Sequence, residues 1–413
     1  MDKSLRQTRI EILMLFGLYI FILPRVYMDY DMGYWREWAL AIHHHGISNA
    51  YNNGINYFPI YVYCLYIFDV IQGTDWNITH HINSIKILFV AFDFLPVFVL
   101  CGFRQKLLHY KIPYLYLLLN IAYVFNSMVW GQLDSIYTNL CFMAIVLGFA
   151  YPAWSVFLFT LALNTKPQAI EFLPVLGVIW LMSIKSIKKF VIAAITGIVT
   201  QILLLLPFLS NGGVKQLYTI ATHSVDLYNK LSICAFNLWY IIVPGNPYFI
   251  NDKDVYFIFS YKTIGLSLFA IASIFVLIPI TRRLYYLRKQ KIKLDSSIYS
   301  PIFLGTGLIC LYFFYFNSQM HERYANPIII FFFFYGVVSK NYKLYILASI
   351  PYFLSLDKCF PDYLPIVHYK IIFASRIIAI WYTAVVIYGS YLYYRLTIVK
   401  IEEGNIIVPD RNR

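Results

Sequence analysis

The stretch 296–320, SSIYSPIFLGTGLICLYFFYFNSQM, contains no Asp, Glu, Lys or Arg. In a helix, about 20 apolar residues are enough to cross a hydrocarbon core of about 30 Å. Similar uncharged runs recur along the 413 residues, at 12–24, 112–133, 135–165, 191–214, 263–281, 324–339 and 377–394. The chain is 60% hydrophobic and 13% charged, roughly half the charged fraction of a soluble protein. These features predict an all-α polytopic membrane protein and exclude a soluble enzyme, a disordered chain and a secreted disulfide scaffold.

Basic residues assign the loops to two sides of the membrane, because loops rich in Lys and Arg stay in the cytoplasm. They form six clusters: Lys3/Arg6/Arg9, Arg104/Lys106/Lys111, Lys185/Lys188/Lys189, Arg282/Arg283/Arg288/Lys289/Lys291/Lys293, Lys340/Lys343 and Arg395/Lys400/Arg411/Arg413. If all six lie on one side, neighbouring clusters are separated by an even number of crossings. Between Lys111 and Lys189 this favours four helices over three, at about 112–129, 135–150, 153–166 and 170–184. With further spans near 87–103 and 344–356, we expect about 11–13 transmembrane helices.

This topology predicts a single integral membrane domain over residues 1–413. Its parts are a long first outer loop at 29–84 with amphipathic surface helices, a second outer loop at 210–262, a basic cytoplasmic loop at 282–297 and a cytoplasmic tail at 396–413. The formal net charge of +13 is then mainly a topology signal. The basic clusters form no continuous stripe, so we expect the lipid bilayer as a partner and no nucleic acid.

The sequence gives little sign of a metal site. The six cysteines are scattered, without Cys-x-x-Cys or Cys/His spacing, and we interpret them as apolar filler. His43, His44 and His45 are consecutive, and on a helix their side chains point about 100° apart, so they cannot all bind one ion. We expect no cofactor, with a divalent metal as the alternative.

Two carboxylates open the first outer loop. Asp29 and Asp31 come shortly after the first uncharged run, and Trp35, Trp38 and the return sequence Tyr57-Phe58-Pro59 follow them. A carboxylate at the membrane surface is suited to accept the proton of an attacking hydroxyl or to bind a metal. The alternative is a solvated start of the loop.

Polar groups also interrupt two apolar runs. The segment Trp130-Gly131-Gln132-Leu133-Asp134 is a tight polar turn, and Lys166-Pro167-Gln168 places a cation at a helix break. Polar groups inside a membrane are costly unless they meet a ligand or a partner charge. Both segments are therefore candidates for binding, and a lysine that snorkels at a span end is the alternative for Lys166.

A third polar set follows the quoted stretch directly. His321, Glu322 and Arg323 place an imidazole, a carboxylate and a guanidinium in three consecutive positions. Arginine is well suited to bind phosphate because its planar fork pairs with two oxygens. The alternative is a structural ion pair. Two further embedded charges, Lys86 and Asp93, lie seven residues apart within one span, and we interpret them as structural.

Taken in order, these motifs resemble the GT-C class of polyprenyl-phosphate-sugar-dependent glycosyltransferases. Asp31, Trp38 and Tyr57-Phe58-Pro59 are similar to the Asp, Trp and Tyr-Pro-Pro pattern of the dolichyl-phosphate-glucose glucosyltransferases and their bacterial relatives. Four further segments look like the later signatures of the bacterial branch: 130–134 (WGQLD), 166–168 (KPQ), 235–239 (AFNLW) and 320–324 (MHERY). The resemblance covers residues 29–324. Phe58 departs from it by replacing the first proline, and Asn56 departs by standing where relatives often have Asp.

The resemblance implies a GT-C-like fold and an inverting glycosyltransferase of cell-envelope glycan biosynthesis. The transferred sugar would be a hexose, either mannose or glucose. It would pass from a polyprenyl-phosphate donor to a glycan or lipid-linked acceptor. Asp31 would be the general base with Asp29 as the reserve, and the donor phosphate would be bound by Lys166, His321 and Arg323. The residues implied to bind substrate are Trp35, Trp38, Tyr57, Trp130, Gln132, Asp134, Gln168, Asn237 and Glu322.

The resemblance also implies where the reaction takes place. The site would face the periplasm or exterior of a bacterial inner membrane, and the aromatic runs 299–316 and 328–335 would form a groove for the isoprenoid tail. Two other functions remain open from the sequence: a polysaccharide polymerase that uses a lipid-diphosphate donor, and a flippase or transporter of lipid-linked saccharides. Transporters usually show internal repeats and functional charges near the midplane, whereas this sequence shows no convincing self-similarity and its candidate charges gather at one surface.

Overall fold

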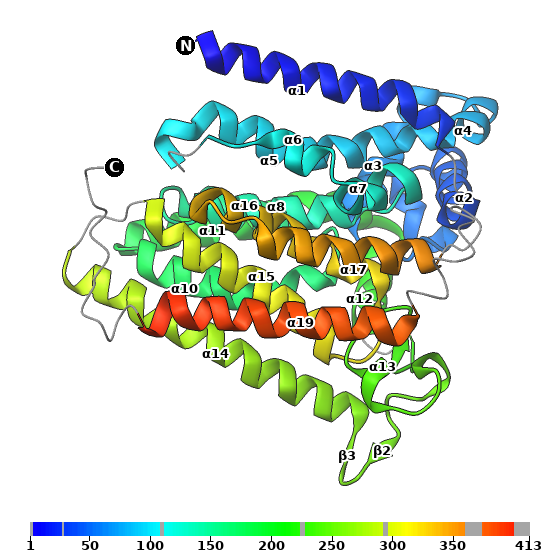
Figure 1. Cartoon of the computed structure of the whole chain (residues 1–413). Coiled ribbons are helices and arrows are strands. Elements are labelled where there is room, and N and C mark those ends of the chain that lie inside the picture. The colour runs from blue at the N-terminus through cyan, green and yellow to red at the C-terminus, as the bar shows by residue number, and fades with distance from the viewer. Residues whose placement is uncertain are drawn as a thin grey trace. The chain divides into compact units, whose positions relative to one another are not determined.

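The computed structural model describes residues 3–26, 29–107, 111–223, 228–291, 296–359 and 374–399, and it is mostly helical (Figure 1). Among the described residues, six helices are long and apolar enough to cross a membrane: Arg6–Arg25, Asp75–Cys101, Ile187–Phe208, Tyr261–Lys289, Tyr299–Phe316 and Ser375–Thr397. Shorter apolar helices lie at Pro59–Gln72, Ile121–Trp130, Asp134–Leu147, Pro152–Leu163 and Pro167–Ser183. A mostly helical chain with several candidate spans agrees with the predicted class, and the total of 11–13 spans stays a prediction.

Parts of the predicted topology lie outside the described residues. They are positions 224–227 of the second outer loop, positions 292–295 of the basic loop, and the tail from residue 400 onward. Within the described residues, the chain folds as two compact units, Met1–Tyr228 and Asn229–Arg413.

The first unit is built of helices joined by short turns. Its elements are α1 (Lys3–Ile22), η1 (Leu23–Arg25), α2 (Asp29–His45), η2 (Ile47–Asn53), α3 (Pro59–Gln72), α4 (Asp75–His81), η3 (Ile82–Ile85), α5 (Lys86–Leu107), α6 (Tyr114–Leu118), α7 (Ile121–Val124), η4 (Phe125–Trp130), α8 (Asp134–Leu147), α9 (Pro152–Leu163), η5 (Pro167–Phe172), α10 (Leu173–Ser183), α11 (Ile187–Leu205), η6 (Leu206–Phe208), η7 (Ser210–Gly212) and α12 (Gly213–His223).

The ends of these helices follow from local sequence. Pro59, Pro152 and Pro167 each occupy the first turn of a helix, where the missing backbone N–H costs nothing. Ser186 caps α11 by accepting a hydrogen bond from the Lys189 backbone N–H at 3.3 Å. As a result, the long uncharged run 135–165 forms two helices, α8 and α9, that meet at the turn before Pro152.

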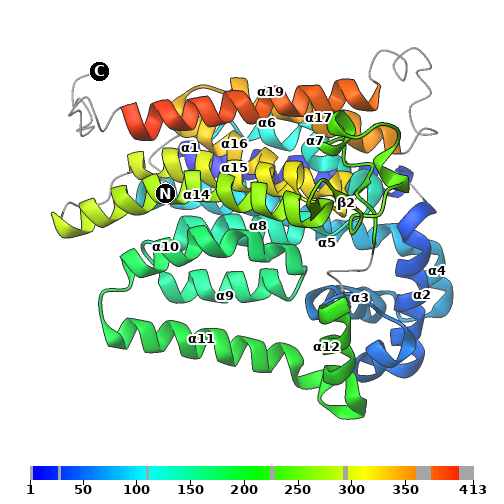
Figure 2. The same cartoon turned by 90° about the horizontal axis from the view of Figure 1, so that it is seen from below.

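Within the first unit, α8 is an inner helix and α11 an outer one. In Figure 2, α8, α9, α10 and α11 lie side by side, with α9 between α8 and α11. From Asp134 to Val146 every residue of α8 is buried, whereas only 11% of the apolar α11 span is buried within the chain. A helix that is apolar yet exposed requires an apolar surrounding, which lipid supplies.

The second unit combines long helices with short strands. Its elements are β1 (Ser232–Ile233), α13 (Trp239–Ile242), η9 (Pro247–Phe249), β2 (Val255–Tyr256), β3 (Phe259–Ser260), α14 (Tyr261–Lys289), η10 (Ser296–Ile298), α15 (Tyr299–Phe316), β4 (Met320–His321), η11 (Glu322–Ala325), α16 (Asn326–Ser339), α17 (Lys343–Cys359), α19 (Ser375–Tyr394) and η12 (Arg395–Val399). Strands β2 and β3 form a hairpin that leads directly into α14 (Figure 1).

The core of the second unit is the pair α15 and α16, and this corrects the expected isoprenoid groove. In the α15 span, 83% of the residues are buried, and α16 is buried from Asn326 to Val337. Gly307 lets the helices approach closely, since a Cβ there would lie 2.5 Å from the Phe332 ring. The runs 299–316 and 328–335 therefore pack against each other, and nearly all of their side chains are buried within the unit.

Candidate functional site

The candidate base Asp31 lies in the first turn of α2. One face of this helix is buried, through Met32, Trp35, Ala39 and Ile42. Asp31 is half-buried, and its carboxylate accepts a hydrogen bond from Gln132 Nε2. The buried face holds the helix in place and the hydrogen bond fixes the orientation of the carboxylate. The side chain of the reserve base, Asp29, lies outside the described residues.

Four aromatic side chains pack together near Asp31, and one of them, Trp35, lies one helical turn after Asp31 in α2. We call Trp35, Trp38, Tyr57 and Tyr61 the aromatic cluster. The ring centroid of Trp35 lies 4.8 Å from that of Tyr61, and 5.2 Å from those of both Trp38 and Tyr57. Trp35 is buried and donates a 3.0 Å hydrogen bond from Nε1 to the Gly131 carbonyl, while Trp38 and Tyr57 are half-buried. The cluster therefore has a fixed inner part and an accessible outer part.

The turn that carries Gln132 requires a glycine. Gly131 has φ +80°, in the left-handed region, and a Cβ there would lie 2.7 Å from Met32 Sδ and 2.8 Å from Lys86 Cε. The Gln132 backbone N–H donates a 2.8 Å hydrogen bond to the Asn126 carbonyl, which closes the turn. The turn thus packs directly on α2 and α5, and this brings Gln132 to Asp31.

Asp134 and Lys166 form a buried ion pair at the start of α8. Lys166 Nζ lies 2.5 Å from Asp134 Oδ1, and Asn126 Nδ2 donates a 3.2 Å hydrogen bond to Asp134 Oδ2. The side chains of Asp134 and Lys166 are 0% and 7% exposed, so each charge depends on the other. The ion pair joins the turn before α8 to the segment before η5.

Lys86 and Asp93, which we interpret as structural, take different partners. Lys86 Nζ donates hydrogen bonds to the carbonyls of Val26 and Val129, at 3.0 and 2.9 Å. Asp93 accepts hydrogen bonds from Ser127 and Asn139. Each side chain connects α5 to the segment that precedes the Gly131 turn.

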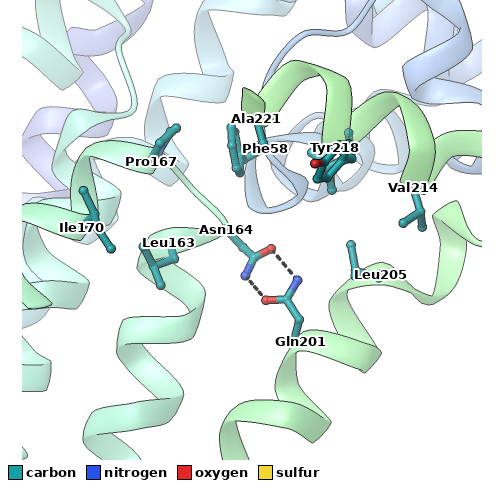
Figure 3. Close-up of a pocket in the computed structure, with 11 residues that line it drawn as sticks. Phe58, Leu163, Asn164, Pro167, Ile170, Gln201, Leu205, Val214, Tyr218 and Ala221 are labelled. Atoms are coloured by element: carbon teal, nitrogen blue, oxygen red, sulfur yellow. Dashed lines mark hydrogen bonds between the residues drawn. The ribbon is translucent and has the colours of Figure 1, made fainter. Parts of the chain in front are cut away.

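A pocket of about 480 Å³ lies beside the Lys166 segment (Figure 3). Its lining is mainly apolar and includes Phe58, Leu163, Pro167, Leu205, Leu217 and Tyr218. The amides of Asn164 and Gln201 bind each other, at 2.7 and 3.1 Å, so these polar groups satisfy each other at the pocket wall. The Ile60 backbone N–H binds the Asn164 carbonyl at 2.9 Å, which fixes the return loop at the pocket edge. The pocket is suited to an apolar chain.

In the second unit, His321, Glu322 and Arg323 are held by a short parallel strand pair. Ser232 pairs with Met320 and Ile233 with His321. Arg323 Nη1 lies 3.3 Å from Glu322 Oε1, and His321 Nδ1 lies 3.9 Å from Glu322 Oε2. The ion-pair alternative therefore describes part of the observed geometry.

Glu322 is the electrostatic centre of this segment. Burial raises the pKa of the Glu322 carboxyl, and the Arg323 guanidinium opposes this shift. Burial also raises the pKa of the Tyr240 hydroxyl, with Cys234, Cys359 and Glu322 adding to the effect in that order. Acidic groups that come from distant parts of the sequence thus lie near one another here.

The remaining candidates from the sequence have mainly structural surroundings. Asn237 Nδ2 donates hydrogen bonds to the carbonyls of Phe314 and Asn317, at 3.1 and 3.3 Å, and so fastens its loop to the end of α15. Trp130 is buried, and Gln168 is half-buried beside Pro167. Their roles in substrate binding stay predictions.

The structure also adds residues that the sequence motifs did not single out. Tyr61 completes the aromatic cluster and Asn126 binds Asp134; the isolated polar side chain of Asn126 in an apolar run was the available signal. Cys64, Cys101, Cys141 and Cys310 are buried, in agreement with apolar filler. Cys234 and Cys359 correct that interpretation, because they are half-buried and lie beside Glu322. Their separation in the sequence gave no signal.

The candidate residues thus come together within each unit. The first unit holds Asp31, the aromatic cluster and the ion pair, and the second holds the segment 321–323. Comparison with protein-family models and with curated proteins finds no match to this chain. The resemblance to the GT-C class therefore stays a prediction from the sequence motifs.

Replacing Gly131 with Ala is expected to destabilise the first unit. The added Cβ would overlap the Met32 and Lys86 side chains and would occupy a left-handed backbone position, at a cost of about 1–3 kcal/mol. Gly177→Ala is the matched control, because a Cβ at Gly177 meets no atom within 4 Å. Thermal unfolding of the purified proteins in detergent gives the melting temperatures of both variants. Equal melting temperatures for the two variants would contradict the close packing of the turn.

The buried ion pair gives a second stability prediction. Lys166→Met leaves the Asp134 carboxylate buried without its cation, so we expect a loss of about 3–5 kcal/mol. Adding Asp134→Asn should recover part of this loss, since no buried charge is then left unpaired. Lys188→Met, at an exposed lysine, is the control and should change stability by less than about 0.5 kcal/mol. Additive effects of the two substitutions would show that the pair is not coupled.

Proposed function

We propose that the protein is an inverting glycosyltransferase. It would move a hexose, mannose or glucose, from a polyprenyl-phosphate donor to a glycan or lipid-linked acceptor at the non-cytoplasmic face of a membrane. The observation that supports this most directly is the placement of Asp31. Its carboxylate is oriented by Gln132 and lies one helical turn from the aromatic cluster, so a proton acceptor and a sugar-stacking surface occur together.

The proposed reaction gives Asp31 the role of general base. The acceptor hydroxyl loses its proton to the Asp31 carboxylate while its oxygen forms a bond to the anomeric carbon. The bond from that carbon to the phosphate oxygen breaks, and the electron pair leaves with the polyprenyl phosphate. Attack from the face opposite the phosphate inverts the configuration. Gln132 keeps the carboxylate in position without taking part in the bond changes.

The donor phosphate requires cations, because negative charge grows on the leaving oxygen. The resemblance assigns this positive charge to Lys166, His321 and Arg323, and within the first unit Lys166 is the cation of the proposed site. Asp134 holds Lys166 in a single buried position, which favours a preorganised site over a flexible lysine. Pro167, the central residue of the segment 166–168, lines the apolar pocket, so Lys166 is next to a residue of the pocket wall.

The apolar pocket is our proposed position for part of the isoprenoid chain, in place of the groove expected between 299–316 and 328–335. A polyprenyl chain is purely hydrocarbon beyond its phosphate, and the pocket wall is apolar apart from two amides that bind each other. The neighbouring return loop, which contains Tyr57, would then set the distance between phosphate and aromatic cluster.

Asp31→Asn tests the proposed base. In proteoliposomes supplied with a polyprenyl-phosphate mannose or glucose, the variant should lose about 10²- to 10⁴-fold in transfer rate, because the amide cannot accept the proton. Its free energy of unfolding should stay within about 0.5 kcal/mol of that of the parent protein, since Asp31 is only half-buried. Glu37→Gln, at an exposed carboxylate on the same helix, is the matched control and should keep full activity.

Three outcomes would contradict this proposal. Substantial transfer by the Asp31→Asn variant would remove Asp31 from the mechanism. A parent protein that transfers sugar only from a lipid diphosphate would be a polymerase, and one that moves lipid-linked saccharides across the vesicle without transfer would be a flippase.

Trp38 tests the aromatic cluster as a sugar-binding surface. Trp38→Ala removes a half-buried ring, and we expect a loss of about 1 kcal/mol of binding, which raises KM about fivefold with little change in kcat. Trp38→Phe keeps a ring and should restore most of the affinity. A loss confined to thermal stability, with KM unchanged in both variants, would show that Trp38 is only a packing residue.

A further inference from the structure

Two cysteines and a glutamate from three separate elements meet in the second unit. Cys234 follows β1, Glu322 begins η11 and Cys359 ends α17. We call these three residues the thiol–carboxylate cluster. Their ligand atoms all lie within 4.8 Å of one another, and Cys359 Sγ lies 3.6 Å from Glu322 Oε2. Thiolate sulfur and carboxylate oxygen are both ligands that proteins use to bind a metal ion.

We propose that the thiol–carboxylate cluster binds a zinc ion through the sulfur atoms of Cys234 and Cys359 and a carboxylate oxygen of Glu322. With Zn–S near 2.3 Å and Zn–O near 2.0 Å, a tetrahedral centre holds a sulfur and an oxygen about 3.5 Å apart. The observed separation of Cys359 Sγ and Glu322 Oε2 is 3.6 Å. Two thiolates also select zinc over magnesium and calcium, which prefer oxygen ligands.

The charges of the site balance when zinc is bound. Two thiolates and the Glu322 carboxylate carry three negative charges, and a divalent ion with the Arg323 guanidinium carries three positive charges. Arg323 Nη1 already lies 3.3 Å from Glu322 Oε1, on the carboxylate oxygen that does not face Cys359. Because Glu322 is only 4% exposed, this neutrality removes the cost of several unbalanced buried charges.

The backbone around Cys234 is shaped to present its thiol. Cys234 has φ +55°, a left-handed conformation that costs a non-glycine residue on the order of 1 kcal/mol. The strand pairing of Ile233 with His321, and a bridge between Cys234 and His321, hold it in this conformation beside Glu322. Unusual backbone conformations that persist in this way are common at ligand sites.

Three protein ligands leave one tetrahedral position for water or for an anionic oxygen, as in zinc sites that act on a substrate. A disulfide between Cys234 and Cys359 is the competing use of the same thiols. A disulfide would use the two sulfurs and not the Glu322 carboxylate, whereas zinc uses all three groups. The proposal does not depend on the glycosyl transfer proposed above, because metal occupancy is measured without any substrate.

The experiment measures zinc in full-length, tag-free protein purified in detergent without reductant or chelator. Elemental analysis should find about one zinc per chain, and cobalt added after zinc removal should give thiolate-to-cobalt charge-transfer absorption. Cys234→Ser and Cys359→Ser should each lose most of the zinc and that absorption, and Glu322→Gln should weaken binding. Cys310→Ala is the matched control, because it removes a buried thiol of the same unit outside the cluster.

Alkylation of the parent protein distinguishes zinc from a disulfide and does not require the variants to fold. Bound zinc should protect Cys234 and Cys359 from a maleimide until a chelator is added, as read by peptide mass spectrometry. Thiols that become reactive only after reduction, and not after chelation, would identify a disulfide and overturn the proposal. Folded parent protein without zinc or cobalt absorption would overturn it as well, and so would unchanged zinc in the Cys234→Ser/Cys359→Ser variant.

Discussion

The ion pair between Asp134 and Lys166 shows the constraint under which the first unit is built. Both side chains are buried in a strongly apolar chain, where an unpaired charge is costly. The same constraint explains why Lys86 binds two backbone carbonyls and why Asp93 lies between Ser127 and Asn139. Each of these four charges is satisfied by a group on another segment, so these contacts join the segments that carry them.

These contacts between buried charges and neighbouring segments place the candidate functional residues at turns between helices. The Gly131 turn packs on α2 and α5 because only a glycine fits beside Met32 and Lys86. That close approach brings Gln132 to Asp31, and burial of Trp35 against the same turn positions the aromatic cluster. In the second unit, the parallel pairing of β1 with β4 holds Cys234 beside Glu322. Apolar helices provide the rigid frame, and a few short polar turns carry the functional groups.

Much of the helical framework was predictable from the sequence, because uncharged runs and prolines act locally. The structure breaks the run 135–165 before Pro152 and breaks the chain again before Pro167, close to the helix boundaries expected there. The groove expected at 299–316 and 328–335 was wrong, since lack of charge does not distinguish a lipid-facing helix from a core helix. Exposed α11 and buried α15 are both apolar, and only packing separates them. The number of membrane crossings stays a prediction.

The sequence by itself determined the mostly helical class, the candidate spans and the polar motifs at their ends. It could do so because hydrophobic runs, proline breaks and charge are properties of neighbouring residues. Only the tertiary structure decided which motifs meet. Asp31 and Gln132 are 101 residues apart, and Asp134 and Lys166 are 32 apart. Cys234 and Cys359 looked like apolar filler for the same reason: their approach to Glu322 depends on strand pairing and helix packing, which no local pattern encodes.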